Sequence, residues 1–161
     1  MQDTIKPVLI FTWGNPSRGD DAFGTEIYEQ LQIDDLDNVD LLTDFQLQIE
    51  HVVDLEKRER VLFIDASVSA TAPFEFHRLK PVQDDSYTTH AMSPESLLAT
   101  YEKVHREAPP PAFMLSVRGY DFGLGLPMSE MASSNLCEAI GFIRQLVLNT
   151  SSNNWEMLAE Y

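Results

Sequence analysis

Short apolar runs alternate with amphipathic segments along the 161-residue chain. The runs at 8–13 and 61–64 are almost wholly apolar, which is typical of strands buried on both faces of a parallel sheet. The segments at 39–43 and 112–117 are also predicted strands. The segment at 74–79 alternates apolar and polar residues, so it is predicted to be a half-exposed edge strand.

Apolar residues at helical spacing lie between these strands. In the segment 22–33, Phe23, Ile27 and Leu31 repeat every four residues along one predicted helix face. Ser93 followed by Pro94 and an acidic residue is a helix start, with a hydroxyl N-cap. Helices are predicted at 22–33, at 47–58 with Ile49, Val52, Val53 and Leu55 as its apolar side, at 93–103 and at 129–147.

Strands that alternate with helices indicate an α/β fold of three layers, α/β/α, around a mostly parallel sheet. We expect one domain over residues 1–148 and a loose polar tail over residues 149–161. Functional sites in such folds collect at the carboxyl ends of the strands.

Composition narrows the class of function. Hydrophobic residues make up 43% of the chain and charged residues 23%, which indicates a globular protein. Eleven basic residues against 26 acidic ones give a net charge of −15, which disfavours nucleic acid and anionic membranes and favours metals and basic segments as partners. No apolar run is long enough to cross a bilayer and no leader precedes the first strand, so a cytoplasmic protein is expected.

The most unusual polar segment is GNPSRGDDAFG at 14–24, directly after the first predicted strand. One acid at a helix start is explained by capping, but two adjacent acids exceed that need. Asp21, the second acid, is therefore the better candidate for a ligand or catalytic carboxylate. The loop could also cradle a phosphate, although it has no lysine and two carboxylates that would repel the ligand unless magnesium intervened.

Two further residues could join Asp21. Asp65 ends the buried strand at 61–64, and it either caps the following loop or points into the cleft at the strand ends. His90 lies between a polar loop and a predicted helix start. Asp21, Asp65 and His90 would form a site with mixed oxygen and nitrogen ligands, which suits nickel, zinc or iron.

Other candidates have simpler explanations. Asp44, after the second predicted strand, is expected to cap the next helix, and the remaining histidines are expected to be ordinary solvated side chains. The single cysteine, Cys137, lies inside a predicted helix and is interpreted as a packed thiol rather than a nucleophile. It excludes an internal disulfide and a cysteine-only metal site.

These motifs together resemble the hydrogenase maturation endopeptidases over roughly residues 8–147. The segment 14–24 is similar to the family's GNxxxxDDGxG loop, IDAS at 64–67 to its aspartate–alanine strand end, and His90 to the histidine before its helix. The resemblance implies a twisted, mainly parallel five-stranded sheet. It also implies that Asp21, Asp65 and His90 are catalytic residues that bind nickel.

The family removes the C-terminal extension of the large subunit of [NiFe] hydrogenases after nickel insertion. The resemblance therefore implies a nickel-dependent protease whose partner is the large-subunit precursor, which itself carries the nickel. We expect it to act as a monomer. The chain departs from the family where DFQLQI at 44–49 replaces DGGTxG, which is consistent with a subgroup that has a different hydrogenase substrate.

Two other functions remain open at this point. The same residues would serve a nickel-sensing assembly chaperone that cuts nothing, and only a cleavage assay separates it from a protease. The loop at 14–21 would also serve a magnesium-dependent phosphate- or nucleotide-binding domain.

Overall fold

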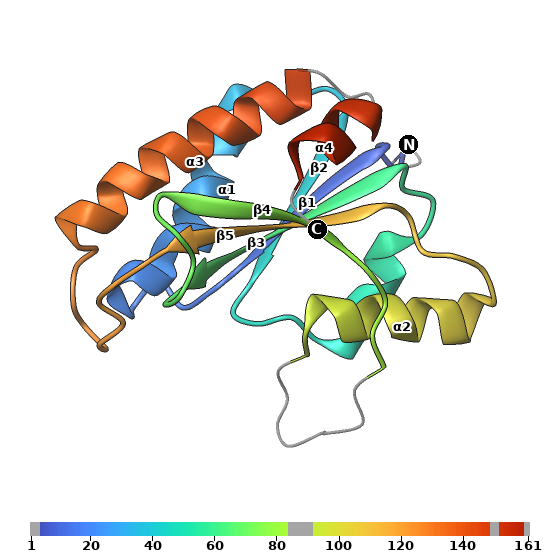
Figure 1. Ribbon diagram of the computed structural model, residues 1–161, viewed down its shortest axis with the longest axis horizontal. Coiled ribbons are helices and arrows are strands. Elements are labelled where there is room, and N and C mark those ends of the chain that lie inside the picture. Colours follow the sequence, from blue (N-terminus) through green and yellow to red (C-terminus); the bar gives the residue numbers. More distant parts are fainter. Residues whose placement is uncertain (1–3, 84–91, 149–151, 160–161) are drawn as a thin grey trace.

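A computed structural model describes residues 4–83, 92–148 and 152–159. The chain forms three layers, in which helices cover both faces of a single sheet (Figure 1). This confirms the predicted three-layer fold.

The sheet has five strands in the order β2-β1-β3-β5-β4. The strands are β1 (Val8–Trp13), β2 (Val39–Asp44), β3 (Arg60–Ser67), β4 (Phe74–Leu79) and β5 (Ala112–Arg118). The first four in this order are parallel to one another, and β4 alone is antiparallel, at the edge beside β5. The mostly parallel sheet and the edge position of the alternating strand are therefore both confirmed.

The helices connect the strands across the two faces. They are the 3₁₀ helices η1 (Gly19–Ala22) and η2 (Ile49–Leu55) and the α-helices α1 (Phe23–Asp34), α2 (Pro94–His105), α3 (Glu130–Leu148) and α4 (Ser152–Leu158). As predicted, Ser93 caps α2: its hydroxyl oxygen accepts the N–H of Ser96 at 3.1 Å.

Two apolar cores lie on opposite faces of the sheet because successive residues of a strand point to opposite sides. In β1, Val8 and Ile10 belong to the core under α1, α3 and α4, whereas Leu9 and Phe11 belong to the core under α2 and η2. A strand buried on both sides needs continuous apolar sequence, which explains the runs that predicted β1 and β3.

The helix predicted at 47–58 is wrong in type and extent, because the structure has the shorter 3₁₀ helix η2 there. Leu55 is fully buried as expected, but Ile49 is 47% exposed and Val53 is 61% exposed. A 3₁₀ helix has three residues per turn, so residues four apart do not share a face as they do in an α-helix. The apolar spacing was therefore a misleading signal.

The loose tail predicted from residue 149 is also wrong for the residues that the structure describes. Residues 152–158 form α4, and Trp155 is fully buried in the core under α3. The Trp155 indole N–H donates to the Leu146 carbonyl at 3.0 Å, and the Arg60 guanidinium lies 5.6 Å from the ring centre. One large buried aromatic side chain offsets the polar composition of this segment.

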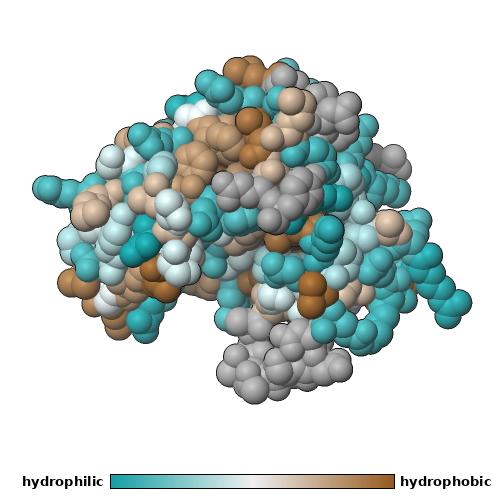
Figure 2. Space-filling model, viewed as in Figure 1, coloured by the Kyte–Doolittle hydropathy of each residue, from teal (hydrophilic) through white to brown (hydrophobic). Residues whose placement is uncertain are grey.

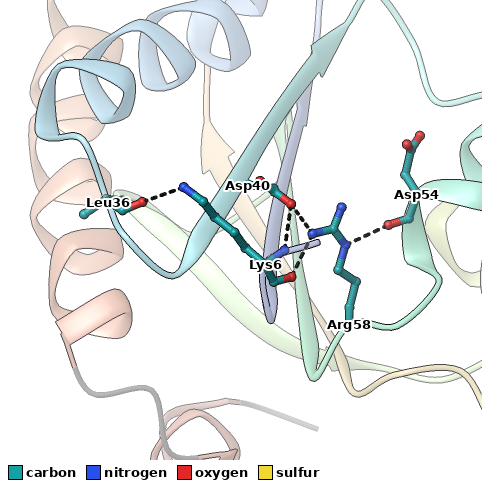
Figure 3. A network of polar contacts seen from close by, with 5 residues as sticks. All are labelled: Lys6, Leu36, Asp40, Asp54 and Arg58. Carbon is teal, nitrogen blue, oxygen red and sulfur yellow. Dashed lines mark hydrogen bonds and ion pairs between the residues drawn. The ribbon is translucent and has the colours of Figure 1, made fainter. Parts of the chain in front are cut away.

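Charged groups hold the amino ends of the strands together, away from the predicted site (Figure 3). The Asp40 carboxylate accepts the Lys6 backbone N–H at 3.1 Å and pairs with the Arg58 guanidinium. Arg58 also donates to the carbonyls of Lys6 and Asp54, at 2.8 and 3.0 Å. These contacts connect the segment before β1 to β2 and to the η2–β3 turn.

Candidate functional site

The loop between β1 and α1 places Asp21 at the carboxyl end of the sheet. The Asp21 carboxylate accepts the Asn15 backbone N–H at 2.7 Å, which closes the loop onto itself. Gly14 allows this closure: its φ is +148°, and a Cβ there would lie 2.2 Å from the Asp21 carbonyl oxygen. Asp21 therefore sits on a fixed backbone.

Asp65 lies near the end of β3, two strands from β2. By the alternation along β3 it points to the same face as Val61 and Phe63, the face covered by α2 and η2. Its carboxylate accepts the Ala66 N–H at 2.8 Å. The sequence left open whether Asp65 caps the loop or points into the cleft, and the structure shows it bonded to its own next residue within the strand.

The negative charge of Asp21 acts on the carboxyl group of Asp65 at the carboxyl edge of the sheet. Burial, the larger cause, and the negative charge of Asp21 together raise the pKa of Asp65 to about 7. The Ala66 N–H, which donates to the carboxylate, and the nearby Trp13 side chain act in the opposite direction and lower the pKa. Burial also raises the pKa of Asp21, against the Asn15 N–H and the Arg18 charge.

A divalent cation would remove the repulsion in this pair, and carboxylate oxygens are suitable ligands for it. His90, the predicted third ligand, lies outside the described residues. Within residues 4–83, 92–148 and 152–159, no three His, Cys, Asp or Glu side chains form a group that could hold a metal ion. The structure therefore brings together two of the three predicted residues.

Asp20 has a different role from its neighbour. It is fully buried, and its carboxylate accepts the backbone N–H groups of Tyr120, Asp121 and Ser129 at 2.6, 2.9 and 2.7 Å. The Ser129 hydroxyl donates to it at 2.9 Å. Burial alone would raise the pKa of Asp20, but these four hydrogen bonds outweigh it and lower the pKa. Asp20 thus joins two loops, which a local motif could not reveal.

The β1–α1 loop has no backbone donors left for a phosphate. Each N–H from residue 14 to residue 21, apart from Pro16, which has none, donates to an acceptor within the protein. Those of Gly14, Gly19 and Asp20 donate to the carbonyls of Asp44, Leu126 and Asp121. A phosphate cradle needs such groups free and pointing at the ligand. The nucleotide-binding alternative therefore loses its geometric support.

Asp44 does not cap the following helix, contrary to expectation. Gln48 is the N-cap of η2, and the Gln48 N–H donates to Nδ1 of His51 at 2.8 Å. Nε2 of His51 then faces the Asp44 carboxylate at 3.3 Å. His51 is only 14% exposed and its ring centre lies 4.5 Å from that of Phe11, so it is not the solvated side chain that was expected.

Cys137 and Trp13 also differ from their sequence-based interpretation. Cys137 is exposed on α3 rather than packed in the core. Trp13 was assigned only to a strand, yet its side chain lies near Asp65 and acts to lower the pKa of that carboxyl group. The strand-end position of Trp13, in the strand beside β3, was the available signal. None of the described helices is long and apolar enough to cross a membrane.

Neither protein-family profiles nor curated protein sequences match this chain. Solved structures do match its fold. The [NiFe] hydrogenase maturation protease HycI from Thermococcus kodakarensis aligns with a TM-score of 0.68 at 21% identity, over 90% of this chain and 94% of that chain. The hydrogenase maturating endopeptidase HybD from E. coli aligns with a TM-score of 0.65 at 20% identity, over 86% and 91%.

A third solved structure shows the same likeness. The hydrogenase 2 maturation peptidase from a Thaumarchaeota archaeon aligns with a TM-score of 0.62 at 23% identity, over 88% of this chain and 98% of that chain. The resemblance drawn from three short motifs thus extends to nearly the whole length of the solved structures. The chain has the fold of the hydrogenase maturation proteases.

Proposed function

We propose that the protein is an endopeptidase that removes the C-terminal extension of a [NiFe] hydrogenase large-subunit precursor after nickel insertion. The observation that carries this proposal is the pair of partly buried carboxylates, Asp21 and Asp65, whose charges interact at the carboxyl edge of the sheet. It occurs in a fold shared with proteins that are named for hydrogenase maturation.

The nickel belongs to the substrate in this proposal, because the precursor already holds it. Asp21, Asp65 and His90 are the residues that would complete its coordination and so dock the precursor. The cation would offset the repulsion between the two carboxylates, so binding energy is available only when the metal is present. A precursor without nickel would lack this energy, and cleavage would follow metal loading.

The same geometry suggests how hydrolysis proceeds. When bound, nickel supplies a Lewis acid that can polarise the scissile carbonyl. A carboxylate of the site that does not bind the metal is suited to take the proton of an attacking water molecule. The Ala66 N–H donates to the Asp65 carboxylate and restricts its orientation.

The decisive experiment mixes the purified protein with nickel-loaded and nickel-free large-subunit precursor and follows the precursor mass. Loss of a C-terminal fragment from the loaded form alone is the expected result. Binding without cleavage of either form would replace the protease with a nickel-sensing chaperone. Cleavage of both forms would retain the protease and remove the nickel dependence.

A further inference from the structure

The connection between β5 and α3, residues 119–129, is joined to the loop that carries Asp21. Four hydrogen bonds end on the Asp20 carboxylate, as described above. Three more join the two backbones: Gly19 N–H to Leu126 carbonyl at 3.1 Å, Gly125 N–H to Ser17 carbonyl at 2.7 Å, and Asp20 N–H to Asp121 carbonyl at 2.7 Å. The two segments therefore form one rigid wall of the site.

This wall exposes two large apolar side chains. Leu124 is 68% exposed and Leu126 is 50% exposed, and we name this pair the apolar lip. Figure 2 shows apolar atoms at the lower left of the molecule, the side on which the β5–α3 connection and the start of α1 lie in Figure 1. Leucines held out into water on a rigid loop beside a candidate site indicate a binding surface.

The charged residues around the apolar lip indicate the charge of the polypeptide segment that binds there. All eleven lysines and arginines lie in the described residues, but only Arg18 and Arg118 belong to the strand ends and connections at the carboxyl edge of the sheet. The acidic residues of the same edge are Asp20, Asp21, Asp44, Asp65, Glu75 and Asp121. Asp121 is exposed and lies on the connection that carries the lip. A basic segment complements this edge.

We propose that the apolar lip and Asp121 bind the segment of the precursor next to the cleaved bond, an extended stretch with apolar side chains and at least one lysine or arginine. This inference rests on the proposed function, because it names the contact that selects the polypeptide at that site. The hydrogen bonds to Asp20 fix the distance between the lip and Asp21. Binding on the lip therefore holds the precursor beside the two carboxylates and adds to its affinity.

The test measures kcat and KM for processing of the nickel-loaded precursor by Leu124→Ser/Leu126→Ser. Both side chains are exposed, so the double variant should fold with an unchanged melting temperature. We expect KM to rise by roughly tenfold or more with kcat nearly unchanged, because binding is lost equally in the ground and transition states. The matched control is Ile33→Ser/Val104→Ser, which changes side chains that are 76% and 64% exposed on α1 and α2.

The charge is tested separately with Asp121→Asn and with a precursor whose extension carries glutamine in place of lysine and arginine. Each change should raise KM at low salt, and the two together should raise it no further than one alone. Raising the salt concentration should reduce the effect of each. Independent, additive effects would overturn the contact between Asp121 and a basic side chain.

The proposed function and the lip can fail separately. If the wild-type protein binds the precursor without cutting it, the protease proposal fails. The proposal for the apolar lip is then tested by the Kd of the precursor. A weaker Kd for the lip variant then supports the lip, and an unchanged Kd overturns it. An unchanged KM in an active enzyme, or an equal rise in the control variant, also overturns it. If the wild-type protein neither binds nor cuts, both proposals fall.

Discussion

The carboxylates of Asp21 and Asp65 repel one another across the carboxyl edge of the sheet, and this repulsion adds to burial in raising the pKa of Asp65 to about 7. They come from different connections, after β1 and within the end of β3. Burying two carboxyl groups of like charge near one another destabilises the folded state, so the pair does not serve to hold the fold together. Such an arrangement is typical of functional sites, where stability is lower than it could be.

Asp65→Asn should therefore stabilise the folded protein at pH 8 while abolishing processing. The wild-type pKa rises from an ordinary value of 3.8 to about 7 on folding, so the folded state binds more protons between those values. The free energy of unfolding then falls as pH rises from about 4 to 7, and stays lower above that range. Asparagine cannot ionise, so the variant should gain on the order of 2 kcal/mol at pH 8, allowing for partial solvent screening.

Urea unfolding of Asp65→Asn and wild type at pH 4.5 and pH 8 measures this effect. The two proteins should differ less at pH 4.5, where most of the wild-type carboxyl is protonated. An equal difference at both pH values would mean that ionisation of Asp65 has no part in it.

Asp21→Asn should reduce processing by more than about 100-fold with little change in melting temperature. The asparagine side-chain oxygen can still accept the Asn15 N–H, so the loop should keep its conformation. Asp37→Asn, at an exposed position between α1 and β2, is the matched control and should process normally. Activity in Asp21→Asn would remove this residue from the site.

Asp20→Ala should lower the stability of the protein, unlike Asp21→Asn, which should leave stability nearly unchanged. The change leaves the buried N–H groups of Tyr120, Asp121 and Ser129 without their acceptor, which should cost about 3–5 kcal/mol. Ser129→Ala removes one hydroxyl donor and should cost about 1–2 kcal/mol. Because folding lowers the pKa of Asp20, its contribution is present above pH 3.8 and is lost as pH falls through the lowered value. Chemical unfolding at pH 7 and pH 3 measures both effects.

Trp155→Ala tests whether α4 is part of the folded domain. Removing a fully buried indole, its hydrogen bond to Leu146 and its contact with Arg60 should lower the unfolding free energy by about 3–5 kcal/mol. Met157→Ala is the control, since that side chain is 84% exposed on the same helix and should have little effect. Equal stability of both variants would restore the interpretation of a loose tail.

Cys137→Ser should leave processing unchanged. The thiol is exposed on α3, where the described residues offer no catalytic partner, and the proposed chemistry uses carboxylates and a metal. Rates within about twofold of wild type are expected. An inactive variant would mean that the nucleophile is a thiol.

The pattern of apolar and polar residues was sufficient to predict the strands that are buried in the same way along their whole length. Continuous apolar runs predicted β1 and β3, and alternation predicted β4 at the edge, because burial on two faces or one dictates the residue at each position. The cap at Ser93 was equally readable, since it joins residues three apart. At η2 the same kind of reasoning failed, because its apolar spacing fits an α-helix better than the 3₁₀ helix that forms.

The sequence by itself determined the order of the elements, the parallel sheet, the place of Asp21 in the connection after β1 and that of Asp65 near the end of β3. Only the tertiary structure decided that these two carboxylates interact, that Asp20 joins loops about a hundred residues apart, and that Trp155 completes a core. The physical reason is distance along the chain. Periodicity and capping act within a few residues, whereas desolvation, charge repulsion and burial depend on which segments the fold brings together.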